Sequence, residues 1–412
     1  MNLFANLAFA ATLGLATAAA LPAQSRTLIL LQENSGRSAL TEWMPASIRT
    51  LAEGIVDRFV ETGESAKFAA LAQGTYQRFV DLSDARCTRA NLLTQLINQT
   101  RDGYTVDLCV LGHGAINELS LNNGPNLTGQ TTRLLWDRNT GQMVNTIVPG
   151  TIRSMLSDAR SLHGSTFQFR LRTVYMCNCE ASSLNDDWLA IGAKVSVGAR
   201  RNNYMPEPML SDFWQHFAKG DKHVAEAAAA SYASSAPIWS LLPGYTTVDP
   251  DTGLTKVQAS QPVVAGDPNL IFRDECLLAV GQSRTFTVQA NQIHRLPSVY
   301  LVAGQTYRFT TSGTWRNGTS VFAPAATNAN GYTPGITDFA RRHSSNMMCL
   351  VGERHARWND VLSFVSGSQF RIGASNTVTV GIRGFLCLYA NDLLTGYLDN
   401  VGSITVTIER IS

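Results

Sequence analysis

Two short segments combine residue types that perform nucleophilic chemistry. Leu111-Gly112-His113-Gly114 ends one apolar run, and Met176-Cys177-Asn178-Cys179-Glu180 ends another. A cysteine attacks as the thiolate, and an adjacent imidazole generates or stabilises that thiolate. If the two runs are neighbouring parallel strands, their carboxyl ends bring His113 beside a cysteine, because ligands and reactive groups gather at that edge of an open sheet. The pattern favours a hydrolase with a His–Cys pair.

Acyl transfer also needs hydrogen-bond donors aimed at the developing oxyanion. Gly114 has no side chain, so its backbone N–H can approach a substrate carbonyl. The backbone N–H of Cys179, at the start of the next expected helix, is a second donor. The same two segments therefore supply a nucleophile, a base and an oxyanion hole.

These segments belong to a stretch in which strands and helices alternate, from residue 27 to about residue 273. The expected strands are Thr27–Gln32, Lys67–Gln73, Thr105–Leu111, Arg172–Met176 and Lys194–Ala199. The expected helices are one through Ile48, Leu51, Ile55 and Phe59, and others over Thr88–Gln99, Thr151–Ala159, Met209–Phe217 and Lys222–Tyr232. Such alternation predicts an α/β domain with a mostly parallel sheet flanked by helices.

The pattern changes near residue 275, after which short alternating segments and turn residues predominate. Expected strands there are Thr285–Val288, Thr306–Thr311, Thr377–Ile382, Phe385–Tyr389 and Ser403–Glu409. This pattern predicts an all-β sandwich following the α/β domain.

The first domain resembles the caspase-like superfamily of cysteine peptidases, which includes caspases, clostripain, gingipains and the CHAT domains. An apolar strand ending in His–Gly and a later one ending in Cys carry the resemblance, with TVYMCNCEAS similar to the CHAT-type strand that ends in Ser-Ala-Cys-Glu. Gly266-Asp267-Pro268 is similar to the close of such domains. The resemblance implies a peptidase domain over 24–273 with His113 as base, Cys179 as nucleophile and Gly114 in the oxyanion hole. The Gln-Ala-Cys-x-Gly box of true caspases is absent, so specificity for Asp does not carry over.

Each reactive residue has a rival. Cys177 competes with Cys179 as nucleophile, and His163-Gly164 is a second His–Gly pair. His163 leaves little room for a strand and crossover before Cys179, so His113 is preferred. A lone buried His or Cys is usually structural, so a non-catalytic scaffold remains the alternative.

The charge of the substrate pocket stays open. In the resembled family the segment after the fifth strand lines the side of the pocket that receives the residue before the scissile bond, and here it holds Arg200 and Arg201. Asp186 and Asp187 are acidic candidates for the same role. The arginines favour an acidic side chain and the aspartates a basic one.

A loop near the C-terminus concentrates oxygen ligands. Asp392, Asp399 and Asn400 carry side-chain oxygens and Gly396 a backbone carbonyl, a set that suits Ca²⁺. The spacing from Asp392 resembles the bacterial galactophilic lectin family, a calcium-dependent β-sandwich, with Tyr332 as a further carrier of a backbone ligand. The resemblance implies a lectin-like calcium- and carbohydrate-binding domain over 277–412. The rival interpretation is that Asp-Asn-x-Gly is turn chemistry alone.

Composition narrows the function classes. The 412 residues include 33 Lys plus Arg and 31 Asp plus Glu, a balance that gives no reason to expect nucleic acid as a partner. Residues 1–23 lack charge and hold an apolar run followed by Ala-rich cleavage sites, which predicts a signal peptide and an exported protein, periplasmic or extracellular. No transmembrane segment is expected in the mature chain. Of the seven cysteines, Cys349 and Cys387 lie on expected strands and would pair if the chain is exported.

Together these features predict an exported cysteine endopeptidase that acts on a protein or peptide, with a calcium-dependent, lectin-like domain that binds a glycan. The alternative is a non-catalytic caspase-like scaffold that carries a carbohydrate-binding lectin domain. No G-x-S-x-G elbow, P-loop or G-x-G-x-x-G motif occurs, which disfavours serine hydrolases and nucleotide enzymes.

Overall fold

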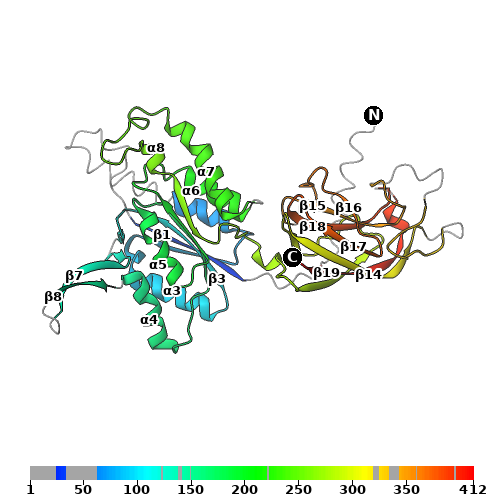
Figure 1. Ribbon diagram of the computed structural model, residues 1–412, viewed down its shortest axis with the longest axis horizontal. Coiled ribbons are helices and arrows are strands. Elements are labelled where there is room, and N and C mark those ends of the chain that lie inside the picture. Colours follow the sequence, from blue (N-terminus) through cyan, green and yellow to red (C-terminus); the bar gives the residue numbers. More distant parts are fainter. Residues whose placement is uncertain are drawn as a thin grey trace. The chain divides into compact units, whose positions relative to one another are not determined.

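The computed structural model describes residues 25–33, 63–121, 124–137, 142–148, 150–219, 222–318, 324–333, 343–358, 360–393 and 396–412 (Figure 1). These residues divide into two compact units, one ending at Phe272 and the other running from Arg273 to Ser412. The expected signal peptide and the expected helix through Ile48 and Phe59 lie outside the described residues. Each unit has a hydrophobic core of its own.

A six-stranded sheet forms the centre of the first unit, in the order β11-β10-β9-β3-β1-β2. Neighbouring strands are parallel except for β10 and β11, which are antiparallel. The strands are β1 (Arg26–Gln32), β2 (Arg78–Ser83), β3 (Thr105–Leu111), β9 (Leu171–Met176), β10 (Val195–Ala199) and β11 (Pro262–Gly266).

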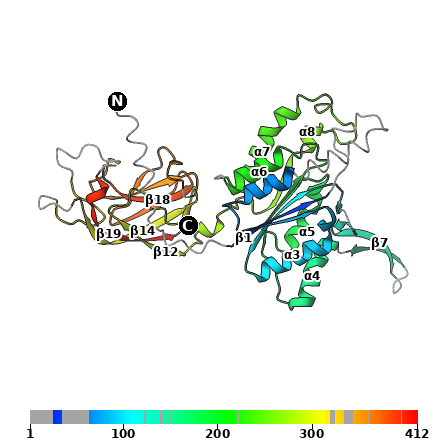
Figure 2. The same cartoon turned by 180° about the vertical axis from the view of Figure 1, so that it is seen from behind.

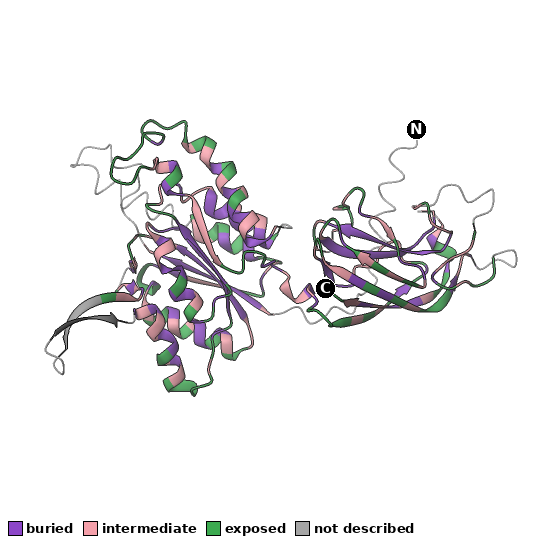
Figure 3. Cartoon of the chain, viewed as in Figure 1, coloured by how far each residue is buried: buried purple, intermediate pink, exposed green. Residues whose placement is uncertain are grey.

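Helices cover both faces of this sheet (Figures 1 and 2). The helices are α3 (Arg89–Arg101), α4 (Thr151–His163), α5 (Asn185–Ala190), α6 (Met209–Ala218), α7 (Val224–Trp239) and α8 (Lys256–Ala259). Successive residues of β1 serve different cores: Ile29 packs with α3, α4 and α5, whereas Leu30 packs with α6 and α7. A strand covered on both faces must be apolar throughout, and the central strands are buried along most of their length (Figure 3).

One expected strand is wrong. Residues 63–72 are helical, so the segment Lys67–Gln73 belongs to a helix and its end, and the strand at the sheet edge is β2. Phe68, Leu71 and Ala72 face the core at helical spacing. The sequence analysis also missed β11, the small sheet β4 (Gly114–Ala115), β5 (Glu118–Leu119) and β6 (Leu127–Thr128), and the hairpin β7 (Thr131–Asp137) and β8 (Gln142–Val148).

A fully buried ion pair spans two central strands. Arg172 on β9 donates from Nε to Asp107 Oδ1 on β3 at 2.9 Å, and both side chains are 0% exposed. The Tyr76 hydroxyl donates to Asp107 Oδ2 at 2.9 Å. The charges are thus paired and hydrogen-bonded, which buried charges require.

The second unit is a sandwich of two antiparallel four-stranded sheets, in the orders β12-β19-β14-β17 and β13-β18-β15-β16 (Figure 2). The strands are β12 (Ser283–Gln289), β13 (Tyr300–Leu301), β14 (Thr306–Arg316), β15 (Leu350–His355), β16 (Phe370–Arg371), β17 (Ser375–Thr379), β18 (Gly384–Ala390) and β19 (Val401–Arg410). Short 3-10 turns are η1 (Asp84–Arg86), η2 (Ala181–Leu184), η3 (Asp274–Cys276) and η4 (Tyr397–Asp399). An α/β unit followed by a β-rich unit confirms the coarse fold prediction.

Among the described residues, no helix has both the length and the apolar character needed to traverse a bilayer.

Candidate active site

The segments that carry His113 and Cys179 leave the sheet at the same edge. Strands β3 and β9 are parallel neighbours, with Val110 opposite Met176. The Cys177 N–H continues the pairing by donating to the Val110 carbonyl at 2.9 Å. His113 and Cys179 follow immediately, at the carboxyl ends of their strands, as the sequence predicted.

The two loops touch directly. A Cβ atom built on Gly114 would lie 2.7 Å from the Glu118 carbonyl oxygen and 2.9 Å from the Cys179 carbonyl oxygen. Real Cβ atoms do not approach so closely, so only glycine fits at this position. Further along the first loop, the Asn117 N–H donates to Ser183 Oγ at 2.8 Å. The His–Gly loop is therefore held against the segment that begins at Cys179.

Sequence reasoning missed Glu33, which follows β1 at the same sheet edge. The His113 N–H donates to Glu33 Oε2 at 2.7 Å. Burial raises the pKa of Glu33, while the His113 N–H and the His113 charge oppose that rise. The signal was available, because β1 neighbours β3 and its carboxyl end lies beside the His–Gly loop. The His113 side chain itself is exposed.

Cys179 differs from the other cysteines. All seven cysteines lie in the part of the chain that the structure describes; six are buried, and Cys179 alone is partly accessible. Burial raises the pKa of the Cys179 thiol, and a hydrogen bond from the Asn203 backbone opposes the rise. Burial raises the pKa of Cys177 well above its usual value. Of the two rival nucleophiles, Cys179 is the one that a reagent can reach.

The backbone turns sharply after Cys179. Glu180 has a φ of 55°, in the left-handed region that non-glycine residues seldom adopt. Its N–H donates to the Arg201 carbonyl at 2.9 Å, and its Oε2 lies 3.6 Å from Arg201 Nη1. The end of β9 is thereby tied to the segment that follows β10.

The four expected substrate residues occupy different settings. Arg200 and Arg201 are exposed and follow β10, beside the turn at Glu180. Asp186 is exposed in the first turn of α5. Asp187 is buried and accepts hydrogen bonds from the Gln130 N–H and from the Arg153 guanidinium. The carboxylate of Asp187 is thus already engaged within the fold.

The rival histidine, His163, is the last residue of α4, ahead of the start of β9. Its ring contacts Phe167 at a centroid distance of 5.5 Å. This position precedes the strand whose carboxyl end carries Cys179, so the arrangement favours His113 as the partner.

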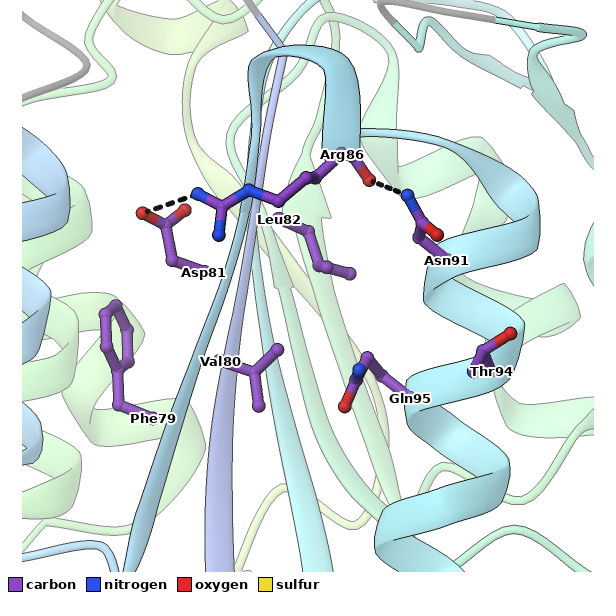
Figure 4. Close-up of a pocket in the computed structure, with 8 residues that line it drawn as sticks. All are labelled: Phe79, Val80, Asp81, Leu82, Arg86, Asn91, Thr94 and Gln95. Atoms are coloured by element: carbon purple, nitrogen blue, oxygen red, sulfur yellow. Dashed lines mark hydrogen bonds and ion pairs between the residues drawn. The ribbon is translucent and has the colours of Figure 1, made fainter.

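A hollow of about 370 Å³ lies between β2 and α3 (Figure 4). Arg86 pairs there with Asp81 at 3.6 Å, and Asn91 Nδ2 donates to the Arg86 carbonyl at 3.0 Å. Since β2 is the edge strand, and β1 and β3 separate it from β9, the hollow is not part of the His113–Cys179 region.

In the second unit the expected calcium ligands converge in part. The Asp392 side chain is buried, accepts from Asn400 Nδ2 at 2.7 Å, and lies 3.0 Å from a Cβ built on Gly396. Asn400 Oδ1 accepts from the Gly318 N–H at 3.2 Å. Asp392, Gly396 and Asn400 thus lie together, with the Asn400 amide hydrogen-bonded to the Asp392 carboxylate.

The other two expected ligands differ. Asp399 is exposed, and the Tyr332 hydroxyl accepts from Asn317 Nδ2 at 3.1 Å. The backbone carbonyl of Tyr332, which was the expected ligand, accepts from the Met347 N–H at 3.1 Å. The described contacts do not include Asp399 in the group formed by Asp392, Gly396 and Asn400.

The expected pairing of Cys349 with Cys387 does not occur. Strand register places Cys387 on β18 opposite Glu353. Cys349 instead lies beside Asn391, whose N–H donates to the Cys349 carbonyl. The two thiols are therefore several residues apart along the strands, too far for a disulfide between them.

Comparisons with known proteins add little to this geometry. No family model matches the chain, and no curated protein matches it. Among solved structures, the chain is similar to the N-terminal domain of EclA, described as a PllA-like lectin, with 23% identity over 31% of this chain and 94% of that one and a TM-score of 0.23. It is also similar to IMPa from Pseudomonas aeruginosa, solved in complex with an O-glycopeptide, with 12% identity over 95% of this chain and 42% of that one and a TM-score of 0.19. Scores this low carry no argument about function, and neither bears on the caspase-like resemblance.

Proposed function

We propose that the first unit is a caspase-like cysteine endopeptidase, exported from the cell, that hydrolyses peptide bonds with His113 and Cys179. One observation carries the proposal. The single cysteine that is not buried lies at the carboxyl edge of the sheet, directly against the loop that holds a histidine. Nucleophilic catalysis requires that combination of an accessible thiol and a nearby base.

In the proposed reaction the His113 imidazole takes the proton from the Cys179 thiol. The sulfur forms a bond to the substrate carbonyl carbon, and the oxyanion accepts hydrogen bonds from the Gly114 and Cys179 N–H groups. The carbon–nitrogen bond then breaks, and His113 gives its proton to the departing amine. Water, deprotonated by His113, hydrolyses the thioester and regenerates the thiol.

The resting state of Cys179 is the thiol, because burial raises its pKa. Catalysis at neutral pH therefore depends on His113 as base rather than on a preformed thiolate. Glu33 acts as a positioning residue through its contact with the His113 N–H at 2.7 Å.

The substrate side of the proposed site is basic. Arg200 and Arg201 are exposed beside Glu180, while Asp187 is engaged with Arg153. An arginine favours a carboxylate on its ligand because the guanidinium fork matches that group. We therefore assign an acidic side chain to the residue before the scissile bond.

For the second unit we propose calcium-assisted glycan binding, which concentrates the enzyme at a glycan-bearing surface. The buried Asp392 carboxylate and the neighbouring Gly396 and Asn400 support it. Calcium would supply a hard Lewis acid to which sugar hydroxyls bind.

The alternative is a non-catalytic scaffold, which the raised pKa of Cys179 and the exposed His113 ring favour. The test is to treat the full chain with a limiting cysteine alkylator, with and without Ca²⁺, and to map the label by mass spectrometry. Peptide substrates with Asp, Asn, Arg or Lys before the scissile bond are assayed in parallel. The proposal expects selective labelling of Cys179 and cleavage of a peptide.

Matched variants separate the two functions. Cys179→Ala and His113→Ala should each abolish cleavage, whereas Cys349→Ser, which changes a buried thiol elsewhere, should leave it unchanged. Slow, uniform labelling of all thiols without cleavage of any peptide would establish the scaffold instead.

A further inference from the structure

The second unit holds a group of metal-binding side chains that is separate from the calcium loop. Among the described residues, His294, Glu353, His355 and Cys387 each offer one ligand atom, and all four atoms lie within 4.8 Å of one another. The Glu353 side chain is 2% exposed and that of His355 is 0% exposed. His294 is 23% exposed, so the group is closed on most sides and open at one.

Strand register assembles three of the four residues. Glu353 and His355 are two positions apart on β15, so they point to the same face of the sheet. Cys387 on β18 is directly opposite Glu353. His294 joins them because its neighbour Arg295 exchanges backbone hydrogen bonds with Leu388, at 2.9 and 2.8 Å.

This face is turned away from the sandwich core. Leu350, Leu386 and Leu388 belong to the core and alternate with Glu353, His355 and Cys387 along their strands. Two segments flank these strands. Arg295 pairs with Leu388 of β18, Phe364 pairs with His355 of β15, and the Trp358 ring packs on Phe385. His294 reaches the cluster from the first of these segments.

Three of the distances between ligand atoms are near those of tetrahedral coordination. His355 Nε2 lies 2.9 Å from Glu353 Oε1, His294 Nδ1 lies 3.6 Å from the same oxygen, and Cys387 Sγ lies 3.5 Å from His294 Nδ1. Bonds of about 2.0 Å to nitrogen and oxygen and about 2.3 Å to sulfur place tetrahedral ligands roughly 3.3 to 3.6 Å apart. Small movements would therefore bring the four atoms around one ion.

Outer contacts orient the ligands as they do in metal sites. His355 Nδ1 lies 3.0 Å from the Asp360 carbonyl, which makes Nδ1 the protonated nitrogen. A neutral His355 would then direct the lone pair of Nε2 at a carboxylate oxygen, and either a metal ion between the two atoms or a second proton on the ring relieves the repulsion. Gln369 Nε2 donates to Glu353 Oε2 at 3.2 Å and holds the carboxylate. In transition-metal sites a histidine ligand typically donates its other ring N–H to a backbone carbonyl, and a carboxylate ligand is typically held by a hydrogen bond of its own.

We propose that His294, Glu353, His355 and Cys387 bind one Zn²⁺ ion that fastens the segment carrying His294 to strands β15 and β18. Two imidazoles and a thiolate suit zinc, whereas Ca²⁺ takes oxygen ligands. Four protein ligands leave no open position, so the role is structural. The competing interpretation is a metal-free ion pair between protonated His355 and Glu353.

The test measures zinc in the full chain by atomic emission, after incubation with Zn²⁺ and removal of loosely held metal. All variants are made in the Cys179→Ala protein, so that zinc bound by the accessible Cys179 thiol does not contribute to the measurement. We expect one equivalent per chain, and we expect excess Ca²⁺ not to displace it. Cys387→Ser and Glu353→Gln should lose most of the zinc, while Cys349→Ser, another buried cysteine of the same unit, should retain it.

A second measurement does not depend on variants that fold poorly. Co²⁺ in place of zinc should give the sulfur-to-cobalt charge-transfer band and the intense visible bands of a tetrahedral thiolate site, and a chelator should remove them and lower the melting temperature of the second unit. Zinc bound at well under one equivalent with an unchanged melting temperature would overturn the proposal in favour of the ion pair. The proposal would also be overturned if Cys387→Ser bound as much zinc as the protein that retains Cys387, or if Ca²⁺ displaced the bound zinc.

Discussion

Gly114 lies so close to Cys179 that a Cβ atom on the glycine would stand 2.9 Å from the Cys179 carbonyl oxygen. The contact joins two loops from neighbouring parallel strands, β3 and β9. It places the residue after His113 against the residue proposed as nucleophile. The lack of a side chain at Gly114 is therefore what permits the proposed site to form.

Replacing Gly114 by alanine should damage the proposed peptidase without unfolding the chain. The added methyl must push the His–Gly loop away from Cys179, and a misplacement of about 1 Å costs on the order of 100-fold in rate. We expect kcat/KM to fall by about that factor. Gly63→Ala is the control, since a Cβ there meets no atom within 4 Å. Similar rates for both variants would show that the loop contact is not needed.

Glu64 should give the first unit a pH-dependent stability. Burial, together with the neighbouring Glu207 charge, raises the pKa of Glu64 from 4.5 to about 7, against the opposing effect of Lys67. The folded state then binds a proton more tightly than the unfolded state, so the free energy of unfolding falls as pH rises through that window.

Glu64→Gln removes this dependence, so its stability relative to the parent should increase between about pH 5 and about pH 8. Urea unfolding, with amide exchange in β1 as the reporter for the first unit, measures the effect. Asp158→Asn, at a more exposed ion pair with Arg89, is the control and should follow the parent slope. If the free energy of unfolding changed with pH in the same way in the parent and in Glu64→Gln, the prediction would be wrong.

The buried ion pair should be sensitive to loss of one partner. Asp107→Asn leaves Arg172 charged and uncompensated in the sheet, which costs about 3 to 5 kcal/mol in comparable pairs. Asp102→Asn is the control, because Asp102 pairs with Arg78 at the surface, where solvent screens the pair and its loss should cost little stability. Chemical denaturation measures the free energy of unfolding of both variants. Equal losses of stability would show that burial does not make the Asp107–Arg172 pair more sensitive than the surface pair.

Substrate preference should follow the charge after β10. We expect peptides with an acidic residue before the scissile bond to be cleaved at least tenfold faster than basic ones. Arg201→Glu should reverse the order, because the exposed Arg201 side chain lies beside the turn at Glu180. Asp187→Asn should leave the preference unchanged, since that carboxylate is engaged with Arg153. A preference for basic peptides in the parent would contradict the assignment.

Much of the first unit was predictable from local pattern. Buried strands such as Thr105–Leu111 are apolar throughout because helices cover both faces. The segment Lys67–Gln73 was wrongly predicted as a strand, because a short apolar run does not by itself distinguish a strand from a buried helix. Glu33 directly follows the expected strand Thr27–Gln32, so its place at the carboxyl edge of the sheet was predictable. Its contact with the distant His113 was not, because that depends on which strands are neighbours.

In the second unit, too, local pattern predicted the strands, whereas contacts between distant segments were not predictable. Short alternating segments predicted its strands, and turn residues predicted the loop at Asp392. The group formed by His294, Glu353, His355 and Cys387 left no recognisable motif, because register between β15 and β18 creates it. The expected Cys349–Cys387 pairing failed for the same reason.

The sequence by itself determined the α/β and β-rich halves and the strand ends at which His113 and Cys179 stand. These follow from hydrophobic periodicity, which is a local property of the chain. Only the tertiary structure decided which thiol is accessible, which carboxylate supports the His–Gly loop, and which side chains meet on the outer face of β15 and β18. Those outcomes depend on register and packing between distant segments, where a shift of one residue turns a side chain to the opposite face.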